Sequence, residues 1–494
     1  MVVYQPTVAS PLDTATLTLN YDDGVGATSV ARTMEGTAVT PADVTISDTD
    51  PYDFGIIAVG SVSEHTFTLT NSGDTDATNL NESTLIAPFN YKGGGFPGTG
   101  GSCVTAGTIL KTVGSCTVVV EFTPTLTGTQ PGVLTFSYND GAAVQIVART
   151  VEGTASAPAK LKISESDAYD FGQTANSGGV IPHTFVITNI GGVDADNLSG
   201  ALPTTDFIFE GGSYPGTTGT CPTGPGTLAP LATCDVVIHF TPQSVGNLSD
   251  TFTMTYDDGV GSGLTEARNV IGEGVAPAFL TISDGATFDY GTVAENSFND
   301  HTFTVTNTGN LAATSFIDVA ATLAAPFEYK GGAFPGSGGT CSNTISVGSN
   351  CKLVVSYDPT SIATDSDTIE LQYFNGITTV NLNRDIEGEA VTVGLIAISD
   401  GATFDYGDVA IGGQSDHVFT LDNTGGVPVT LMSGSGLNPP YRFKDGLYPG
   451  TGGTCLASLA NGANCTIVVT FEPSAAGLLS DSIDITYNLS LIHI

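Results

Sequence analysis

The clearest pattern along the chain is an alternation of apolar and polar residues that returns four times, each time directly after a cysteine. In its first copy, Val118, Val120 and Phe122 share a period of two with Cys116. Such an alternation predicts a β-strand whose buried face carries the cysteine and the apolar side chains. A proline two residues after the last aromatic residue of each run ends the strand, because proline cannot donate to a ladder. The runs follow Cys116, Cys234, Cys351 and Cys465, and the prolines are Pro124, Pro242, Pro359 and Pro473.

The strand belongs to a longer unit that also recurs four times. Each unit opens on an aromatic-Asp-aromatic-Gly sequence, continues through His-x-Phe, Asn-x-Gly and an aromatic-Pro-Gly loop, and contains two cysteines. The first cysteines lie at 103, 221, 341 and 455, so the period is 118, 120 and 114 residues. This period is that of an independent domain with its own core, and it is too long for a solenoid unit.

The repeats divide the chain into four domains and two end pieces. Residues 1–40 match the closing hairpin of a repeat, and we expect the first part of that domain to lie upstream of this sequence. The last six residues resemble a translated sequencing adapter, and we expect them to be a non-native tail. Short linkers that contain proline favour an extended array. The expected domains are 41–159, 160–278, 279–394 and a truncated 395–488, followed by the tail at 489–494.

Composition favours strands over helices. Glycine (62 residues) and proline (25 residues) break the chain so often that little room is left for helices. Short strands joined by regular turns, in a domain of this size, predict an all-β fold of tandem antiparallel sandwiches of the immunoglobulin type.

Charge and hydropathy exclude several classes of partner. Twelve basic residues against fifty acidic ones give a net charge of −38, which repels nucleic acid and anionic membrane surfaces. No apolar run approaches the ~18 residues of a membrane span, so we expect no membrane insertion in this sequence. The first residues do not read as a signal peptide, although disulfides imply export, and this favours a start further upstream.

The eight cysteines predict one disulfide in each repeat, closed within the repeat. Paired cysteines are typical of an oxidising compartment, so the expected location is extracellular or at the cell surface. Zinc would need four ligands, and each repeat supplies two cysteines and no Cys-x-x-Cys spacing. The expected pairs are Cys103–Cys116, Cys221–Cys234, Cys341–Cys351 and Cys455–Cys465.

With Phe-Gly, His-x-Phe, Asn-x-Gly, Pro-Gly-Thr-Gly-Gly-x-Cys and Phe-x-Pro in fixed order, the repeats resemble the choice-of-anchor D family of bacterial exported proteins. They are also similar to the wider group of ASPM-SPD-2-Hydin immunoglobulin-like domains. The resemblance covers roughly 38–488. It implies tandem sandwiches in a secreted or surface-attached bacterial protein, and no sorting anchor is found in this sequence.

The recurring histidines and arginines could carry chemistry, but we interpret them as structural residues. A histidine at 65, 183, 301 and 417 is in phase with an inward phenylalanine and is expected to be a half-buried strand residue. A recurring arginine, such as Arg149, is expected to pair with an acidic neighbour across the sheet. No residue combination resembles a catalytic triad, a phosphate loop or a zinc-protease motif, so we expect no enzyme activity, no catalytic residue and no cofactor.

Two binding hypotheses are left open. The aromatic-Pro-Gly loops would present an exposed ring to a surface glycan or protein. Aspartates near the expected domain junctions, as in Ser47-Asp48-Thr49-Asp50, Ser283-Asp284 and Ser399-Asp400, would bind Ca²⁺. The loop aromatics are Phe96, Tyr214, Phe334 and Tyr448.

The sequence thus predicts a non-catalytic extracellular repeat protein that acts as a surface stalk, spacer or adhesion protein. The alternatives are a glycan- or calcium-dependent binding module, or the non-catalytic part of a larger secreted enzyme.

Overall fold

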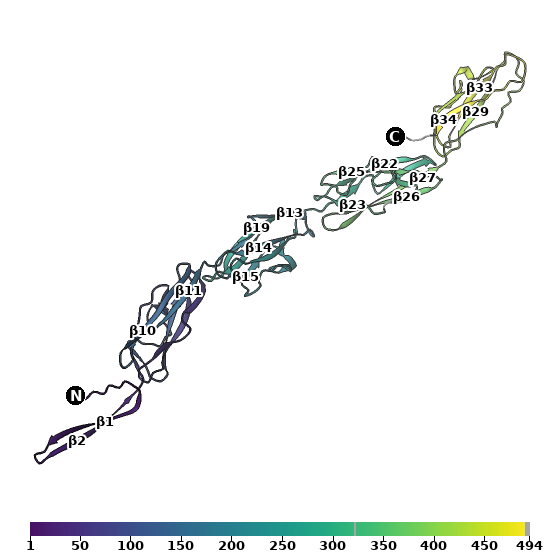
Figure 1. Cartoon of the computed structure of the whole chain (residues 1–494). Helices are drawn as coiled ribbons and strands as arrows, with labels where there is room; N and C mark the ends of the chain where they lie inside the picture. The colour runs from purple at the N-terminus through teal and green to yellow at the C-terminus, as the bar shows by residue number, and fades with distance from the viewer. Residues whose placement is uncertain (321–322, 490–494) are drawn as a thin grey trace. The chain divides into compact units, whose positions relative to one another are not determined.

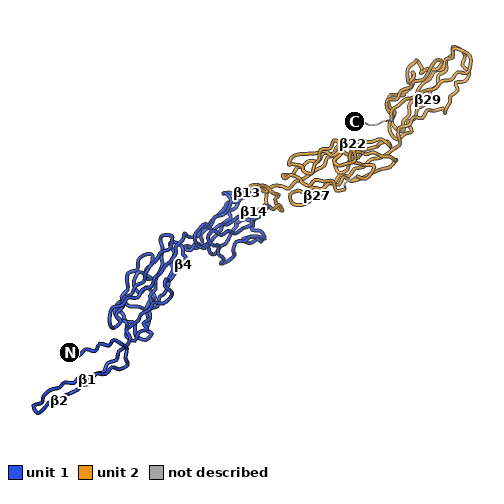
Figure 2. The backbone as a smooth tube through the Cα atoms, viewed as in Figure 1, with its two compact units in different colours: residues 1–171, 181–240, 248–272 blue, residues 172–180, 241–247, 273–494 orange. Residues whose placement is uncertain are grey.

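The computed structural model describes residues 1–320 and 323–489. The predicted tail at 489–494 therefore lies outside the described residues, except for its first residue. The chain divides into two compact units (Figure 2). One comprises residues 1–171, 181–240 and 248–272, and the other comprises residues 172–180, 241–247 and 273–494.

The chain opens with an isolated two-stranded hairpin, β1 (Ser10–Asp22) and β2 (Ala27–Ala38), at the dark purple end of Figure 1. Asp23 closes its turn by accepting the backbone N–H groups of Val25 and Gly26. Apolar side chains such as Leu19 (59% exposed) have no second sheet against which to pack. A lone hairpin of this kind is marginally stable in water.

The first repeat is a sandwich of two sheets. One sheet has the antiparallel order β3-β5-β9-β7, and the other has the order β4-β11-β10-β6-β8, in which β4 and β11 run parallel. The strands β10 and β11 form a long closing hairpin (Figure 1). The elements are β3 (Val44–Ile46), β4 (Tyr52–Ala58), β5 (Ser63–Asn71), β6 (Ala77–Glu82), β7 (Phe89–Tyr91), the 3₁₀ turn η1 (Lys92–Gly94), β8 (Gly107–Ile109), β9 (Gly114–Phe122), β10 (Gly128–Asn139) and β11 (Val144–Ser156).

The second repeat has the same plan, with sheets β12-β14-β17-β16 and β13-β19-β18-β15. Its elements are β12 (Leu161–Ile163), β13 (Tyr169–Ala175), β14 (Ile181–Asn189), β15 (Asp196–Ala201), β16 (Phe207–Phe209), η2 (Glu210–Gly212), β17 (Thr233–Phe240), β18 (Gly246–Asp257) and β19 (Leu264–Val275).

The third repeat contains sheets β20-β22-β25-β24 and β21-β27-β26-β23. Its elements are β20 (Leu280–Ile282), β21 (Thr287–Ala294), β22 (Asn299–Asn307), β23 (Thr314–Asp318), β24 (Phe327–Tyr329), β25 (Asn350–Tyr357), β26 (Thr364–Phe374) and β27 (Thr379–Val391).

The fourth repeat keeps the first of the two sheets, in the order β28-β29-β33-β31, and has only β32-β30-β34 in place of the second. Its elements are β28 (Ile396–Ile398), β29 (Ser415–Asn423), β30 (Val429–Ser435), β31 (Tyr441–Phe443), η3 (Lys444–Gly446), β32 (Ser458–Leu459), β33 (Asn464–Phe471) and β34 (Asp484–Leu489).

Each repeat has its own hydrophobic core between its two sheets. In the first repeat, Phe67, Phe122, Phe136 and Val151 are fully buried, and the other three repeats have equivalent clusters. The predicted alternation places Val118, Val120 and Phe122 inside, as expected. The predicted fold class, tandem immunoglobulin-like sandwiches, is confirmed.

Candidate functional sites

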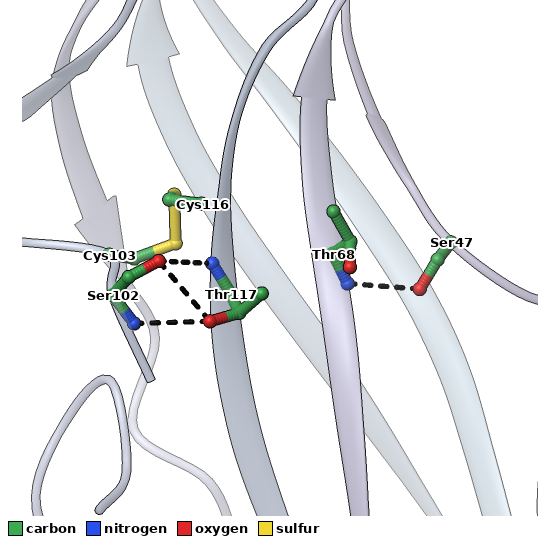
Figure 3. Close-up of a disulfide and its surroundings, with 6 residues drawn as sticks. All are labelled: Ser47, Thr68, Ser102, Cys103, Cys116 and Thr117. Atoms are coloured by element: carbon green, nitrogen blue, oxygen red, sulfur yellow. Dashed lines mark hydrogen bonds between the residues drawn. A yellow bond between two sulfur atoms is a disulfide. The ribbon is translucent and has the colours of Figure 1, made fainter. Parts of the chain in front are cut away.

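The cysteines form the four predicted disulfides, each within one repeat. Figure 3 shows the first, which joins a loop cysteine, Cys103, to Cys116 on β9. Beside it the Thr117 backbone N–H donates to Ser102 Oγ (3.0 Å), and the Ser102 N–H donates to Thr117 Oγ1 (3.2 Å). A hydroxyl at the position before the first cysteine accepts an equivalent N–H in the other repeats, from Asp235, Lys352 and Thr466.

The backbone of each aromatic-Pro-Gly loop is hydrogen-bonded to the strand that follows the second cysteine of its repeat. The Val119 N–H on β9 donates to the Pro97 carbonyl (2.8 Å), and an equivalent bond forms in all four repeats. Gly98 fits closely over the Val119 carbonyl, where an added Cβ would lie 2.2 Å from the oxygen. The loop backbone is therefore bonded to the strand, and the preceding aromatic residue turns inward.

The prediction that these loop aromatics are exposed is wrong. The Phe96 ring is half-buried and packs edge-on against Tyr91, with centroids 5.4 Å apart. Burial raises the pKa of Tyr214 to about 12, and its hydroxyl has no hydrogen-bond partner. The rings thus contribute to the core. The other three ring pairs are Tyr214–Phe209, Phe334–Tyr329 and Tyr448–Phe443.

The repeat histidines are half-buried, as predicted, and each stacks on the first aromatic residue of the aromatic-Asp-aromatic-Gly motif in its repeat. His65 lies 3.9 Å from Tyr52 between ring centroids, and its Nε2 lies 3.1 Å from Asp48 Oδ2. The equivalent stacks are His183 on Tyr169, His301 on Phe288 and His417 on Phe404.

The same aspartate also binds a serine. Ser47 Oγ donates to Asp48 Oδ2 (2.6 Å) and accepts the Thr68 backbone N–H (2.9 Å), the bond drawn in Figure 3. The hydrogen bond from Ser47, followed by that from His65, lowers the pKa of Asp48. This Ser-Asp-His cluster recurs with Ser283, Asp284 and His301, and with Ser399, Asp400 and His417.

The cluster has the residues of a catalytic triad but not its order. In a triad the histidine lies between the nucleophile and the carboxylate and removes the proton of the hydroxyl. Here Asp48 lies between Ser47 and His65, and the serine proton already points at the carboxylate. The histidine does not contact the serine, so the arrangement fixes a turn and lacks the histidine base of a triad.

The calcium hypothesis concerned the same aspartates, and their carboxylates are already engaged. Asp48 binds Ser47 and His65, and Asp50 accepts the Thr150 backbone N–H (2.9 Å). Within residues 1–320 and 323–489, no group of three or more His, Cys, Asp or Glu side chains is arranged to hold a metal ion. The calcium hypothesis therefore gains no support from the geometry.

The recurring arginine does not pair with an acidic side chain across the sheet, which corrects the sequence prediction. Arg149 Nη2 on β11 donates to the Ile46 carbonyl (2.5 Å) at the end of β3. The arginine thus joins the two sheets of the sandwich by satisfying a backbone acceptor. Arg268 and Arg384 donate in the same way to Ile163 and Ile282.

Sequence reasoning noted the asparagine of the Asn-x-Gly motif without giving it a role. Asn71 is fully buried at the end of β5. Its Nδ2 donates to the carbonyls of Thr75 (2.8 Å) and Ile109 (3.1 Å), and its Oδ1 accepts the N–H groups of Asp43 and Gly73. It holds three chain segments together. A fixed polar residue directly after an alternating strand was the available signal. Asn189, Asn307 and Asn423 are its equivalents.

Comparison with known proteins supports this reading of the repeats. Residues 45–154 match the family model of the HYDIN/CFA65/VesB-like Ig-like domain. This match confirms the resemblance to ASPM-SPD-2-Hydin-type Ig-like repeats. The match covers the first repeat, and this Ig-like fold is typically non-catalytic. No curated protein matches the chain.

Several solved structures are also similar to the chain. A protein of unknown function from Porphyromonas gingivalis W83 is 10% identical over 46% of this chain and 99% of its own, with a TM-score of 0.18. A PapD-like domain of human CEP192 is 18% identical over 24% and 87%, with a TM-score of 0.18. Mouse cadherin-23 EC22–24 is 10% identical over 72% and 100%, with a TM-score of 0.24. At these TM-scores we conclude nothing further from the likenesses.

No helix within the described residues has the length and apolar character of a membrane span.

Proposed function

We propose that this chain is an extracellular structural repeat protein that serves as a stalk or spacer. One observation carries the proposal: the polar side chains that recur in the repeats form their hydrogen bonds within the repeat itself. Asp48 binds Ser47 and His65, Arg149 binds a backbone carbonyl, and Asn71 binds three backbone segments. When the recurring polar residues of a repeat all stabilise that repeat, the protein is suited to a role that needs a stable chain of a given length.

The disulfides support the location. All eight cysteines are paired in four disulfides, in a chain whose repeats each have a hydrophobic core of their own. Such bonds persist in oxidising compartments and are rare in the cytosol. Attachment to a bacterial surface, as in choice-of-anchor D proteins, is part of the proposal and rests on the order of the sequence motifs.

Single-molecule force spectroscopy of the full chain tests the proposal. We expect four separate unfolding steps, because each repeat has its own core. Each disulfide shields the chain between its cysteines from stretching, and the two cysteines are 13 positions apart in the first two repeats and 10 positions apart in the others. At ~3.5 Å per residue, reduction should lengthen the steps by roughly 45 Å and 35 Å.

The matched control is the double variant Cys103→Ser with Cys116→Ser. It should lose the response to reductant in one step and keep it in the other three. Unfolding as one compact body, or steps whose lengths ignore the reductant, would contradict a spacer built from independently stable repeats.

Adhesion to a glycan or protein through the aromatic-Pro-Gly loops stays a prediction. Its remaining support is that Gly93, Gly94 and Gly95 expose the loop backbone in the first repeat. Because Phe96 packs on the core, Phe96→Ala would disturb stability and binding together. Lys92→Ala at the same loop leaves the core intact, so it is the better test in a glycan or protein binding assay. Unchanged binding in that variant would remove the loop from consideration.

A further inference from the structure

The turn of the closing hairpin is built on an aspartate in the first two repeats and on an asparagine in the third. Asp140 and Asp258 each accept two backbone N–H groups, from the residues two and three positions further on, at 2.6 to 2.8 Å. In the third repeat Asn375 Oδ1 accepts the N–H groups of Ile377 and Thr378, both at 2.9 Å. Of these three repeats, only the third therefore builds the turn with an amide in place of a carboxylate.

This asparagine is followed by a glycine. Asn375-Gly376 is one of two Asn-Gly pairs in the sequence, and the other is Asn461-Gly462. A glycine nitrogen approaches the preceding side chain with the least obstruction, because glycine has no Cβ. Attack of that nitrogen on the side-chain carbonyl carbon closes a five-membered ring, so the reaction is intramolecular and needs no second molecule to be positioned.

The nitrogen of Gly376 is available for such an attack. Its N–H has no hydrogen-bond acceptor among the residues that the structure describes. In the first repeat the equivalent N–H, that of Gly141, donates to Asn139 Oδ1 (2.9 Å). Phe374 occupies the position of Asn139 in the third repeat and offers no acceptor.

The second Asn-Gly pair is not available in this way. The Gly462 N–H donates to the Asn423 carbonyl (3.0 Å), and this bond has to break before the nitrogen can react. Within the described ranges 1–320 and 323–489, no N–H group donates to the Asn461 side chain either. The two Asn-Gly pairs therefore have the same local chemistry in different surroundings.

The carbonyl group of Asn375 is also polarised. The N–H groups of Ile377 and Thr378 point at Oδ1, which is the oxygen that gains negative charge when Cγ becomes tetrahedral. Backbone donors already in place at a developing oxyanion lower the barrier of a reaction at that carbonyl. The turn thus supplies a free nucleophile and an activated carbonyl in adjacent residues.

We propose that Asn375 is a self-modifying residue, which the third repeat converts to aspartate with water as the only other reactant. The Gly376 nitrogen forms a bond to Asn375 Cγ and gives its proton to water. The Cγ–Nδ2 bond then breaks, Nδ2 takes up a proton and leaves as ammonia, and a cyclic imide is left. Water opens the imide at Cγ to give aspartate, or at the main-chain carbonyl carbon to give isoaspartate. No atom is oxidised or reduced.

The aspartate product fits the turn. It has the position and the two backbone donors that Asp140 and Asp258 have in their own repeats. Hydrogen bonds to a carboxylate are stronger than those to a neutral amide, so this product should hold the turn at least as firmly. The isoaspartate product adds an atom to the backbone between Phe374 and Thr379, which pair across the hairpin. The modification is independent of the stalk function.

Peptide mapping by mass spectrometry of the full chain, incubated at neutral pH, is the first test. In the folded chain we expect Asn375 to lose its amide at least ~10-fold faster than Asn461, because only Asn375 has the free nitrogen and the two donors. In urea, with the disulfides reduced, the two rates should become similar. Equal rates in the folded chain, or a faster reaction of Asn375 after unfolding, would overturn the proposal.

The variant Phe374→Asn tests the free nitrogen. It offers the Gly376 N–H the acceptor that Asn139 offers to Gly141, and one added hydrogen bond should slow the loss of the amide roughly fivefold. Phe374 is 38% exposed, so the core should tolerate the change. Phe374→Leu is the matched control: it removes the ring, adds no acceptor and should leave the rate nearly unchanged.

The products identify the route. Isoaspartate at position 375 can form only through the cyclic imide, so we expect both products in the peptide map. Aspartate without any isoaspartate would overturn the attack by Gly376, since direct hydrolysis by water gives aspartate alone. A rate that Phe374→Asn and Phe374→Leu change equally would overturn the role of the free N–H.

Discussion

The third and fourth repeats contain the same ten-residue sequence and fold it differently. Residues 282–291 and 398–407 both read Ile-Ser-Asp-Gly-Ala-Thr-Phe-Asp-Tyr-Gly. In the third repeat Thr287–Ala294 is the strand β21, which pairs in parallel with β27. In the fourth repeat residues 404–410 have no such partner and form no strand. The intrinsic propensity of the two segments is the same, so the partner strand decides the conformation.

The other half of the sandwich is the same in both repeats. The sheets β20-β22-β25-β24 and β28-β29-β33-β31 have matching order, and both carry the Ser-Asp-His cluster, the buried asparagine and the disulfide. The second sheet differs between the two repeats, and the hydrogen bonds and the disulfide of the first sheet are nevertheless the same in both. Changes that touch only the shared sheet should act equally on the two repeats, and changes that touch the second sheet should not.

The largest difference is expected from truncating the aromatic residue that β27 covers in the third repeat. Tyr357 is fully buried, whereas its equivalent Phe471 is 8% exposed. Tyr357→Ala should destabilise the third repeat by ~3–5 kcal/mol, as core aromatics do, and Phe471→Ala should cost the fourth repeat clearly less. Hydrogen exchange read repeat by repeat in the full chain measures both. Equal costs would mean that the smaller second sheet does not loosen the core of the fourth repeat.

Removing a disulfide should cost the two repeats the same amount. Both bonds close a loop between cysteines ten residues apart, on the shared sheet. The chain-entropy estimate for such a loop is ~3 kcal/mol. The paired variants Cys341→Ser with Cys351→Ser, and Cys455→Ser with Cys465→Ser, compared by urea unfolding, check this. A much greater loss in the fourth repeat would show that its disulfide compensates for its smaller second sheet.

The buried asparagines should also be equivalent. Asn307 and Asn423 each donate to two backbone carbonyls and accept two backbone N–H groups. Replacing either by Ala leaves those buried groups unpaired, with an expected cost of ~2–3 kcal/mol in its own repeat. Thermal unfolding followed by repeat-resolved exchange measures the loss. The isosteric Asn→Asp variants separate the lost donors from the lost volume.

The arginine that joins the two sheets has no counterpart in the described part of the fourth repeat. Arg384 Nη2 donates to the Ile282 carbonyl (2.6 Å). Arg384→Gln should destabilise the third repeat by ~1–2 kcal/mol and leave exchange in the fourth unchanged. Arg32→Gln, in the isolated hairpin, is the control that should cost the third repeat nothing.

The smallest effect on stability is expected when the pH is lowered into the acid range. Hydrogen bonds from Ser283 and Ser399, and then from His301 and His417, lower the pKa of Asp284 and Asp400 below the usual value. A depressed carboxyl pKa adds stability above the unfolded value of ~3.9, and that stability is lost as the pH falls through the folded pKa. As the pH falls from ~3.9 through the folded pKa of the two aspartates, the third and fourth repeats should lose stability together. Asp284→Asn should flatten the acid response of the third repeat only, and an unflattened curve would assign the response to other carboxylates.

Most of the fold followed from the sequence because its signals are local. The alternation after each second cysteine placed Val118, Val120 and Phe122 correctly, and the cysteine pairs within each repeat gave the disulfides. The histidines were correctly expected to be half-buried, because they share the phase of an inward phenylalanine.

The errors concern contacts between distant segments. The Phe96 ring was expected outside, at the tip of its loop, but the hydrogen bond from Val119 to Pro97 holds the loop against the strand. The target of Arg149 is a carbonyl 103 residues away, which no sequence period reveals. The different states of 287–291 and 403–407 are beyond any local pattern, since their sequences are identical.

The disulfide loops have a consequence for survival outside a cell. Between Cys103 and Cys116 the loop exposes Val104, Leu110 and Val113, which an extracellular protease can reach. A cut there leaves two fragments that are still joined through the sulfur atoms, and the core strand β9 stays whole in the second fragment. A repeat cleaved at this loop would therefore keep its covalent continuity, and the chain would be broken only by reduction.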